Sequence, residues 1–225
     1  MKEVIMKKLL FWIVLIVGIV ALIGSCAKKD DETAAPAAAD HTTSTTSYIS
    51  TTTTASGSIT MGDDTLSGVY ASECLTSAST IAFFVAASFW PSEVNAYGNV
   101  FVVTGSDNIS IELYAFTDTS CSNLSQSQKT VSDNVTFGSA SGSNYPVTYN
   151  NQTKALTVHT TAAETALETL YSNALDFIVG TPIELPMSGS GLRYGLWTLS
   201  GTTWYEASSS SATPTSAGTV PHVKQ

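Results

Sequence analysis

The stretch 98–116, GNVFVVTGSDNISIELYAF, carries the clearest structural signal in this chain of 225 residues. Two runs rich in β-branched and aromatic residues, 98–104 and 109–116, flank the turn-forming sequence Gly-Ser-Asp-Asn. In the second run Ile109 and every second residue after it are apolar, which is the period of a strand with one buried face. The stretch therefore predicts a β-hairpin. Its other face, which we expect to meet solvent or a partner sheet, carries Ser110, Glu112 and Tyr114.

Similar patterns recur on the C-terminal side of this hairpin. Runs at 147–149 and 155–159 flank Asn-Asn-Gln, and runs at 195–199 and 202–206 flank Ser-Gly, so both pairs predict hairpins. The apolar run 80–90 fits a buried strand or a short helix, and its periodicity favours neither. Taken together, the patterns predict one mainly β domain over residues 58–207, an antiparallel barrel or sandwich.

One amphipathic helix is expected within this β domain. The sequence from Thr161 to Glu164 fits a capping box, in which a threonine begins a helix and a glutamate three residues later bonds back to it. Apolar residues then recur at helical spacing as far as Ala174. About three turns should therefore lay one apolar stripe on the sheet.

The N-terminal residues 1–25 predict an export signal. Lys2, Lys7 and Lys8 precede an uncharged, apolar run that ends in Ile-Gly-Ser before Cys26. This stretch resembles the lipobox of bacterial lipoproteins, and the resemblance implies cleavage before Cys26 and acylation of that cysteine. An uncleaved signal anchor and ordinary secretion are the alternatives. Because Ala27 follows the cysteine and not aspartate, the family comparison favours the outer membrane, at its periplasmic face or at the cell surface.

Flanking segments of low complexity surround the β domain. Residues 26–57 are rich in Ala, Thr and Ser, lack the apolar residues for a core and predict a disordered tether behind the lipidated cysteine. Residues 208–225 return to Ser, Thr and Pro and predict a loose tail, unless 220–223 docks back on the domain.

The cysteine content predicts one disulfide bond. With Cys26 acylated, Cys74 and Cys121 remain as an even pair in a chain exported to an oxidising compartment. Closing a loop of about 48 residues would stabilise the domain by about 4 kcal/mol in the chain-entropy model. A redox or metal-binding thiol pair is the alternative, but the spacing is far from C-x-x-C.

Charge and motif content argue against several classes of function. The formal net charge is −9, and removing residues 1–25 takes away three lysines and one glutamate, so nucleic acid is not expected as a partner. The three histidines, His41, His159 and His222, lack metal-ligand spacing, and neither a nucleophile elbow nor a phosphate-binding loop occurs. We therefore expect no catalytic residues, no metal and no cofactor, and a protein that is not an enzyme.

The start of the β domain resembles the opening of a lipocalin-like barrel. In that family Gly-x-Trp begins the first strand, and here the motif reads Gly68-Val69-Tyr70. The segment from Tyr114 to Cys121 is similar to a cysteine-ending corner in small secreted bacterial domains of uncharacterised function. The resemblance covers about residues 64–207 and implies the fold far more than an activity.

Four residues of the β domain are candidates for lining a ligand pocket: Tyr70, Arg193, Trp197 and Trp204. Lipocalin-like barrels often place an arginine from a late strand across the aromatic residue of the first strand. By that resemblance Arg193, the only arginine of the chain, would stack on Tyr70 and contribute about 0.5 to 2 kcal/mol. Trp197 and Trp204 lie on the late hairpin, where core packing is the alternative use.

Two functions of different classes follow from these patterns. The first is a membrane-anchored interaction protein of the adhesin type, held on the bilayer by acylated Cys26 and binding a host or envelope protein. The second is a carrier of a small apolar ligand in the barrel interior. A purely structural lipoprotein is a third, and the sequence does not decide among the three.

Overall fold

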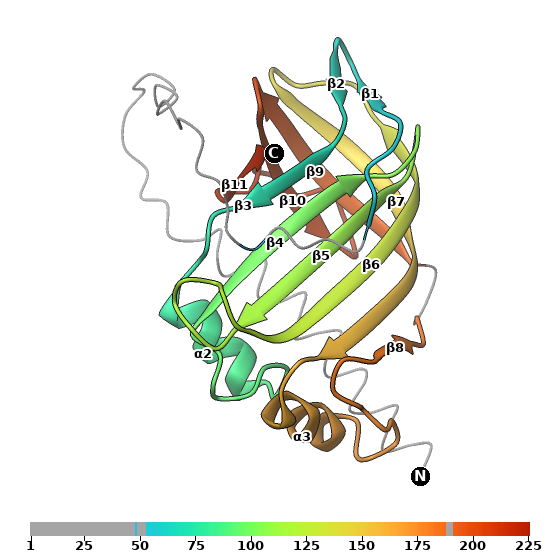
Figure 1. Cartoon of the computed structure of the whole chain (residues 1–225). Helices are drawn as coiled ribbons and strands as arrows, with labels where there is room; N and C mark the ends of the chain where they lie inside the picture. Colours follow the sequence, from blue (N-terminus) through green and yellow to red (C-terminus); the bar gives the residue numbers. More distant parts are fainter. Residues whose placement is uncertain (1–47, 49–52, 188–190) are drawn as a thin grey trace.

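The computed structural model describes Tyr48, residues 53–187 and residues 191–225. Figure 1 shows the elements of this part of the chain, which are strands and two helices. In chain order they are β1 (Ile59–Met61), β2 (Asp64–Leu66), β3 (Val69–Ser72), α2 (Ala78–Ala86), β4 (Ala96–Val103), β5 (Ile109–Phe116), β6 (Leu124–Phe137), β7 (Asn144–Val158), α3 (Thr161–Leu170), β8 (Pro182–Leu185), β9 (Leu192–Ser200), β10 (Thr203–Ser209) and β11 (Pro221–Lys224).

The main sheet closes into an antiparallel barrel. Its strand order is β6-β5-β4-β3-β11-β10-β9-β7-β8, and an additional pairing of β6 with β7 closes an eight-stranded barrel that leaves β8 outside the ring. All described pairings are antiparallel, and β1 and β2 form a separate two-stranded ribbon. The prediction of a mainly β, lipocalin-like antiparallel fold is confirmed, and of the two predicted architectures the barrel is the observed one.

The hairpin from which the fold was predicted is present as β4 and β5. Val103 pairs with Ile109, and the register continues without interruption to the pair Ala96 and Phe116. Ile109 lies in the barrel core. The opposite face of β5 is also covered, because Glu112 is only 2% exposed. A further layer of chain must therefore lie outside this part of the barrel.

The predicted hairpin around residues 150–152 is wrong, because β7 runs through this segment as one continuous strand. At this point β7 leaves its partner β9, whose last pair is Asn150 with Leu192, and joins β8, whose first pair is Lys154 with Leu185. The register against β6 also shifts here, between Val131 and Ser132. The amide-rich sequence marks a β-bulge, where β7 also changes its partner strand. Bulges and hairpin turns favour the same residue types, so the sequence pattern did not distinguish them.

Two helices are present in the described residues, where one was expected. The undecided run at 80–90 contains most of α2, and Ser77 caps this helix by accepting a bond from the Thr80 amide. α3 begins one residue earlier than predicted, because Thr160 is the N-cap and accepts from the Ala163 amide at 3.1 Å. Glu164 therefore does not stand at the capping-box position. In Figure 1 both helices lie at the same end of the barrel.

Large side chains fill two regions of the barrel. One cluster combines the β1–β2 ribbon with inward-facing residues of the strands, among them Met61, Leu66, Phe101, Tyr149 and Trp197. A second cluster joins α2 and the loop after it to β5, with Trp90 and Val94 buried against Ala115. Burying each such side chain contributes about 1.5 to 3 kcal/mol. The ribbon and α2 therefore each add a layer of apolar packing to the barrel.

The β domain extends beyond the predicted boundary at residue 207. β10 continues to Ser209, and β11 lies between β10 and β3, pairing His222 with Trp204 on one side and with Ser72 on the other. Docking of the C-terminal segment, the alternative to a loose tail, is therefore what occurs. Without β11, the ring would be open between β3 and β10.

The N-terminal boundary also differs from the prediction. Tyr48 is 5% exposed and packs with Ala55 on the outer face of β3 to β5, although both were assigned to the tether. The signal sequence 1–25, Cys26 and the tether as far as residue 47 lie outside the described residues.

Candidate functional site

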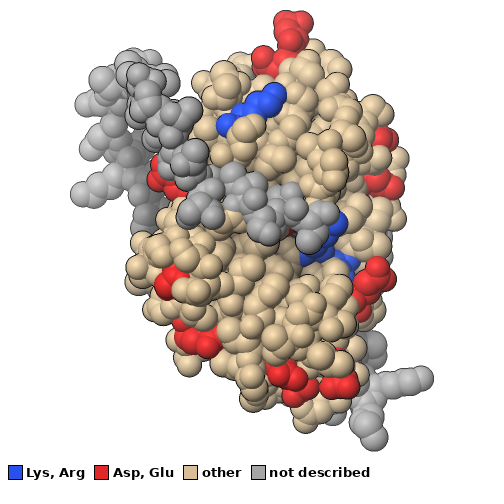
Figure 2. Space-filling view, viewed as in Figure 1, with Lys and Arg blue, Asp and Glu red and all other residues tan. Residues whose placement is uncertain are grey.

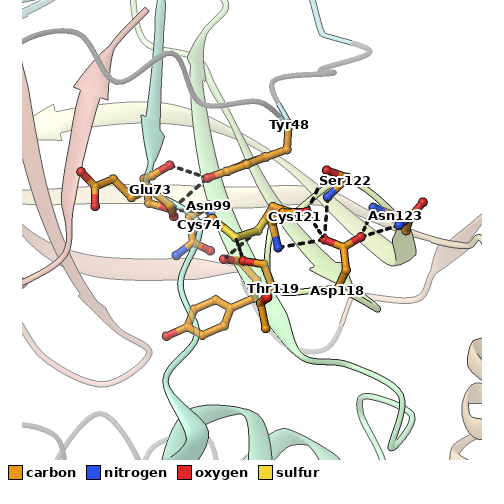
Figure 3. Close-up of a disulfide and its surroundings, with 12 residues drawn as sticks. Tyr48, Glu73, Cys74, Asn99, Asp118, Thr119, Cys121, Ser122 and Asn123 are labelled. Atoms are coloured by element: carbon orange, nitrogen blue, oxygen red, sulfur yellow. Dashed lines mark hydrogen bonds between the residues drawn. A yellow bond between two sulfur atoms is a disulfide. The ribbon is translucent and has the colours of Figure 1, made fainter.

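The predicted disulfide between Cys74 and Cys121 is present, with its Cα atoms 5.8 Å apart (Figure 3). Cys74 follows β3, and Cys121 lies in the turn between β5 and β6. The bond joins segments separated by 47 residues along the chain. It lies among packed apolar residues on the outer side of the barrel, which is a structural environment and not that of a redox site.

The turn that carries Cys121 is organised by Asp118. Its carboxylate accepts hydrogen bonds from the backbone amides of Ser120, Ser122 and Asn123 (Figure 3). These bonds, that from Ser122 first, lower the pKa of Asp118 to about 2. Cys121 itself has a φ of 54°, a conformation that few residues other than glycine adopt. The ionised carboxylate therefore stabilises a strained corner from which the disulfide bond leaves.

Tyr48 and Thr53 cover the outer face of the barrel beside the disulfide. The Tyr48 hydroxyl donates to the Ser72 carbonyl at 2.5 Å, and its ring packs edge-on against Phe116. Thr53 donates to the Glu112 carboxylate at 2.5 Å, and Tyr114 donates to the same carboxylate. The outward-facing polar residues of β5 are therefore satisfied within the protein and do not form a surface site.

Three of the predicted pocket residues, Tyr70, Trp197 and Trp204, lie together inside the barrel. All three are 1% exposed or less. The Trp204 ring meets Tyr70 edge-on at 5.6 Å between centroids and Trp197 at 4.6 Å. Such contacts contribute about 0.5 to 1.5 kcal/mol each beyond burial. The three rings form part of the packed core, the alternative use considered for the tryptophans.

Arg193, the fourth predicted residue, does not stack on Tyr70. The cation over the Tyr70 ring is Lys224, whose Nζ lies 6.0 Å from the centroid. Arg193 pairs with Tyr149 across β9 and β7, and its positive charge opposes the rise that burial causes in the pKa of Tyr149. The difference arises because β10 and β11 separate β9 from β3, so an inward side chain of β9 first meets its neighbours on β7 and β10.

Arg193 belongs to a group of polar side chains inside the barrel, which we call the interior charge cluster: Tyr149, Lys154, Arg193, Glu206 and Ser208. Burial raises the pKa values of Tyr149 and Glu206, and both the charge of Arg193 and hydrogen bonding from Ser208 oppose this rise. The charge of Arg193 also adds to the lowering of the pKa of Lys154. The cluster contains two cations and one carboxylate. It therefore has an excess of positive charge inside a chain whose net charge is −9.

The register of the strands places these side chains on the inner face. Glu206 pairs with Trp197, and Lys154 pairs with Thr130, which in turn pairs with the core-facing Ile111. Side chains alternate between the two faces of a strand, and directly paired residues share a face. Lys154 and Glu206 therefore point into the barrel.

Most side chains at the level of the cluster are only partly buried. Lys154, Arg193, Glu206 and Ser208 all keep part of their surface accessible, as do the inward-facing residues Ile111, Leu113 and Gln128. In a closed barrel, accessible surface on an inner face borders internal space or an opening to it. The aromatic core around Trp204 is fully buried, whereas Lys154 and Leu113 are only partly buried.

Three buried tryptophans, Trp90, Trp197 and Trp204, have an indole N–H without a partner in the described part of the chain. That of Trp197, a residue with 0% exposure, lies next to the cluster, because its ring packs against Tyr149. This nitrogen lies beside Gly195, where a Cβ atom would come within 3.0 Å of it. Gly195 is the inward-facing position between Trp197 and Arg193, so the indole N–H lies on the side of the ring nearer to Arg193.

Burial changes the proton affinities within the cluster. It lowers the pKa of Lys154 to about 8, an effect to which the nearby charge of Arg193 adds. It also raises the pKa of Glu206, against which hydrogen bonding from Ser208 and the charge of Arg193 act. The Lys154 ammonium lies 5.5 Å from the centroid of the Phe89 ring. At neutral pH the Lys154 side chain is therefore still mostly charged, in surroundings that solvate charge poorly.

Sequence reasoning missed Lys154 and Glu206. Glu206 could have been found by alternation, since it lies two residues after the inward-facing Trp204 on the same strand. Lys154 was lost because the turn predicted at 150–152 ended the strand before it. Only the continuous β7, with its bulge, puts Lys154 on the inner face.

Other features of the described residues provide weaker evidence for a functional site. An open depression of about 300 Å³, with no charged lining residue, lies between β6, β7 and Thr213. Ser127 and His159 approach within 3.1 Å on the outer face, without a described carboxylate partner for the imidazole. In the part of the chain that the structure covers, three or more potential metal ligands do not gather anywhere, and neither helix could span a bilayer.

Comparison with known proteins adds no assignment to this geometry. No protein-family model matches the chain, and none of the curated proteins is significantly similar to it.

Proposed function

We propose that this protein is a membrane-anchored lipoprotein whose barrel binds a small molecule in its interior, at the interior charge cluster. The observation that carries the proposal is the presence of partly accessible, inward-facing charged residues within a closed barrel. Buried charges cost free energy unless they are paired or serve a ligand. An interior that only packed the fold would contain apolar side chains at these positions, as it does around Trp204.

The shape of the barrel supports the same function. Ligand sites in small barrels are concave, mostly apolar and contain a few convergent polar groups. Ile111, Leu113 and Phe89 supply apolar surface next to Lys154, and Trp197 supplies an unpartnered donor beyond Arg193. The site proposed from the sequence shifts accordingly, from Tyr70 and Trp204 towards Arg193 and Lys154.

The anchor and the location are part of the proposal. The sequence Ile-Gly-Ser-Cys26 supports cleavage and acylation, and two or more acyl chains hold a protein stably on a bilayer. Ala27 supports the outer membrane. A barrel displayed there on a tether would hold its ligand in the periplasm or at the cell surface.

A second candidate is the adhesin-type interaction protein. The observation that favours it is the pair Ile178 and Val179, 55% and 45% exposed, on the loop after α3. Adjacent exposed apolar side chains are typical of contact sites between proteins. Changing both residues to Ser should abolish binding of the protein to the host cell or matrix if this candidate is correct. It should leave that binding unchanged if the barrel interior is the functional site.

Native mass spectrometry of the full-length, acylated protein tests the proposed function. The protein would be purified from membranes in two chemically different detergents, and a small-molecule adduct common to both is the expected result. Gln128→Trp should fill the interior and remove the adduct, whereas Thr153→Trp, on the exposed outer face of β7, should keep it. A protein with no adduct in either detergent, or an adduct retained by Gln128→Trp, would contradict the proposal.

A further inference from the structure

The interior charge cluster indicates the chemical class of the ligand, and this inference rests on the function proposed above. The inward-facing polar groups of the cluster and next to it include three donors: the Lys154 ammonium, the Arg193 guanidinium and the Trp197 indole N–H. Glu206 is the one carboxylate among the described cluster residues, and the charge of Arg193 and hydrogen bonding from Ser208 favour its charged form. A group with several acceptor atoms and a negative charge would complete such a set.

The distribution of charge over the molecule strengthens this assignment. The described residues include only four lysines and arginines, and two of these, Lys154 and Arg193, point into the barrel. Figure 2 shows one face of the surface, with acidic residues around its margin and little positive charge. An anion would therefore be attracted to the interior rather than to the acidic surface.

Apolar surface adjoins the cluster on one side. Ile111 lies in the same row of paired residues as Lys154, and Leu113 is the next inward-facing residue of β5. The Phe89 ring lies under the Lys154 ammonium, and the Phe89 carbonyl accepts a hydrogen bond from Gln126 at 3.1 Å. The bond from Gln126 thus holds the loop that places the Phe89 ring beside Lys154.

We propose that the barrel binds an anionic amphiphile, whose carboxylate lies between Arg193, Lys154 and the Trp197 indole N–H and whose apolar tail lies against Ile111, Leu113 and Phe89. The bound carboxylate neutralises the excess positive charge of the cluster. It also supplies an acceptor for the buried indole donor. A cationic amphiphile would instead meet two cations, and a neutral alcohol would leave them without a counter-charge.

Binding of three probes that share a tail and differ in the head group tests this inference. Octanoate, octanol and octylamine would be titrated into the full-length protein in zwitterionic phosphatidylcholine nanodiscs, with binding followed by tryptophan fluorescence near pH 7. Octanoate should bind most tightly and octylamine most weakly. Losing one charge-assisted hydrogen bond should weaken binding by about tenfold, so we expect Arg193→Gln and Lys154→Met each to weaken octanoate binding by that factor and to leave octanol binding unchanged.

Two control variants test whether the positive charge inside the barrel is what binds octanoate. Lys129→Met removes the same charge from the outer face of β6, where Lys129 pairs with Glu112, and should not change octanoate binding. Arg193→Lys keeps the charge and should restore most of the affinity that Arg193→Gln loses. Thermal unfolding of each variant identifies any that fails to fold, and the comparison of octanoate, octanol and octylamine on the wild-type protein stands without such a variant.

The outcomes distinguish this inference from the proposed function. Octanol binding as tightly as octanoate, unaffected by Arg193→Gln, would overturn the anionic head group and leave interior ligand binding intact. Failure of all three probes to bind would also overturn this inference, whereas the absence of a native adduct is the result that removes the proposed function itself.

Discussion

His222 is the residue whose buried position has the most direct consequence for stability. It is 3% exposed on β11, its ring meets Phe101 edge-on, and its Nδ1 lies 3.3 Å from the Trp204 carbonyl. Burial lowers the pKa of His222 from 6.5 to about 4, although the carbonyl contact opposes the change. The folded protein therefore holds this imidazole neutral over a pH range in which the unfolded chain protonates it.

The sign of the pH effect follows from this difference. Between about pH 6.5 and pH 4 the unfolded state binds more protons, so the free energy of unfolding falls as the pH falls. The His222 contribution should amount to about 3 kcal/mol over this range, at about 1.4 kcal/mol per pKa unit. Urea unfolding at several pH values should show this loss in the wild type and a smaller loss in His222→Phe. Parallel curves for the two proteins would exclude His222 as the cause.

Gly98 shows how closely the N-terminal segment fits the barrel. A Cβ atom at this position would overlap the Tyr48 hydroxyl, at 2.3 Å. Overpacking of this kind costs about 1 to 3 kcal/mol. We expect Gly98→Ala to lower the free energy of unfolding by this amount in urea titrations, and Tyr48→Ala to remove most of the difference between glycine and alanine. Equal costs of Gly98→Ala in both backgrounds would mean that Tyr48 does not pack there in solution.

At the scale of elements, the disulfide joins the end of β3 to the β5–β6 turn. The chain-entropy model assigns about 4 kcal/mol to a loop of this length. Cys74→Ala/Cys121→Ala should therefore unfold at a clearly lower urea concentration than the wild type under oxidising conditions. Adding reductant should bring the wild type to the stability of the variant, since no described thiol other than this pair is present. Insensitivity of the wild type to reductant would contradict a stabilising role.

Strand pairs that are adjacent in the chain could be predicted, and exchanges of partner could not. The β4–β5 and β9–β10 hairpins follow from alternation and turn residues, because both signals are local. The bulge in β7 uses the same polar residues as a turn, and only the long β6 beside it keeps the strand continuous. β11 is four residues long and is held by pairing with β3, which lies far away in the sequence.

The candidate site follows the same division. The sequence placed Trp197, Trp204 and Arg193 on strands of the β domain as candidates for its interior. It did not predict which side chains they contact. Arg193 meets Tyr149 and Glu206 because of the order of strands around the ring, and that order depends on barrel closure. The cluster is therefore a product of topology, and a local pattern does not contain it.

At the scale of the whole molecule, the proposed lipid anchor would hold the proposed binding barrel on a bilayer. Metabolic labelling with an alkyne analogue of palmitate should label the wild-type protein, and Cys26→Ser should remove the label. Cys74→Ala/Cys121→Ala should retain it, because the disulfide cysteines are not acylated. A label that persists in Cys26→Ser would place acylation elsewhere and remove the proposed anchor.

The central claim is that an anionic amphiphile lies inside the barrel, and a crystal structure with ω-bromooctanoate tests it most directly. Anomalous scattering locates the bromine independently of how the rest of the electron density is interpreted. We predict the carboxylate at Arg193 and Lys154 and the bromine in the space beside Leu113 and Gln128. Bromine bound only on the outer surface, at the open depression between β6 and β7 or at Ile178 and Val179, would contradict the account.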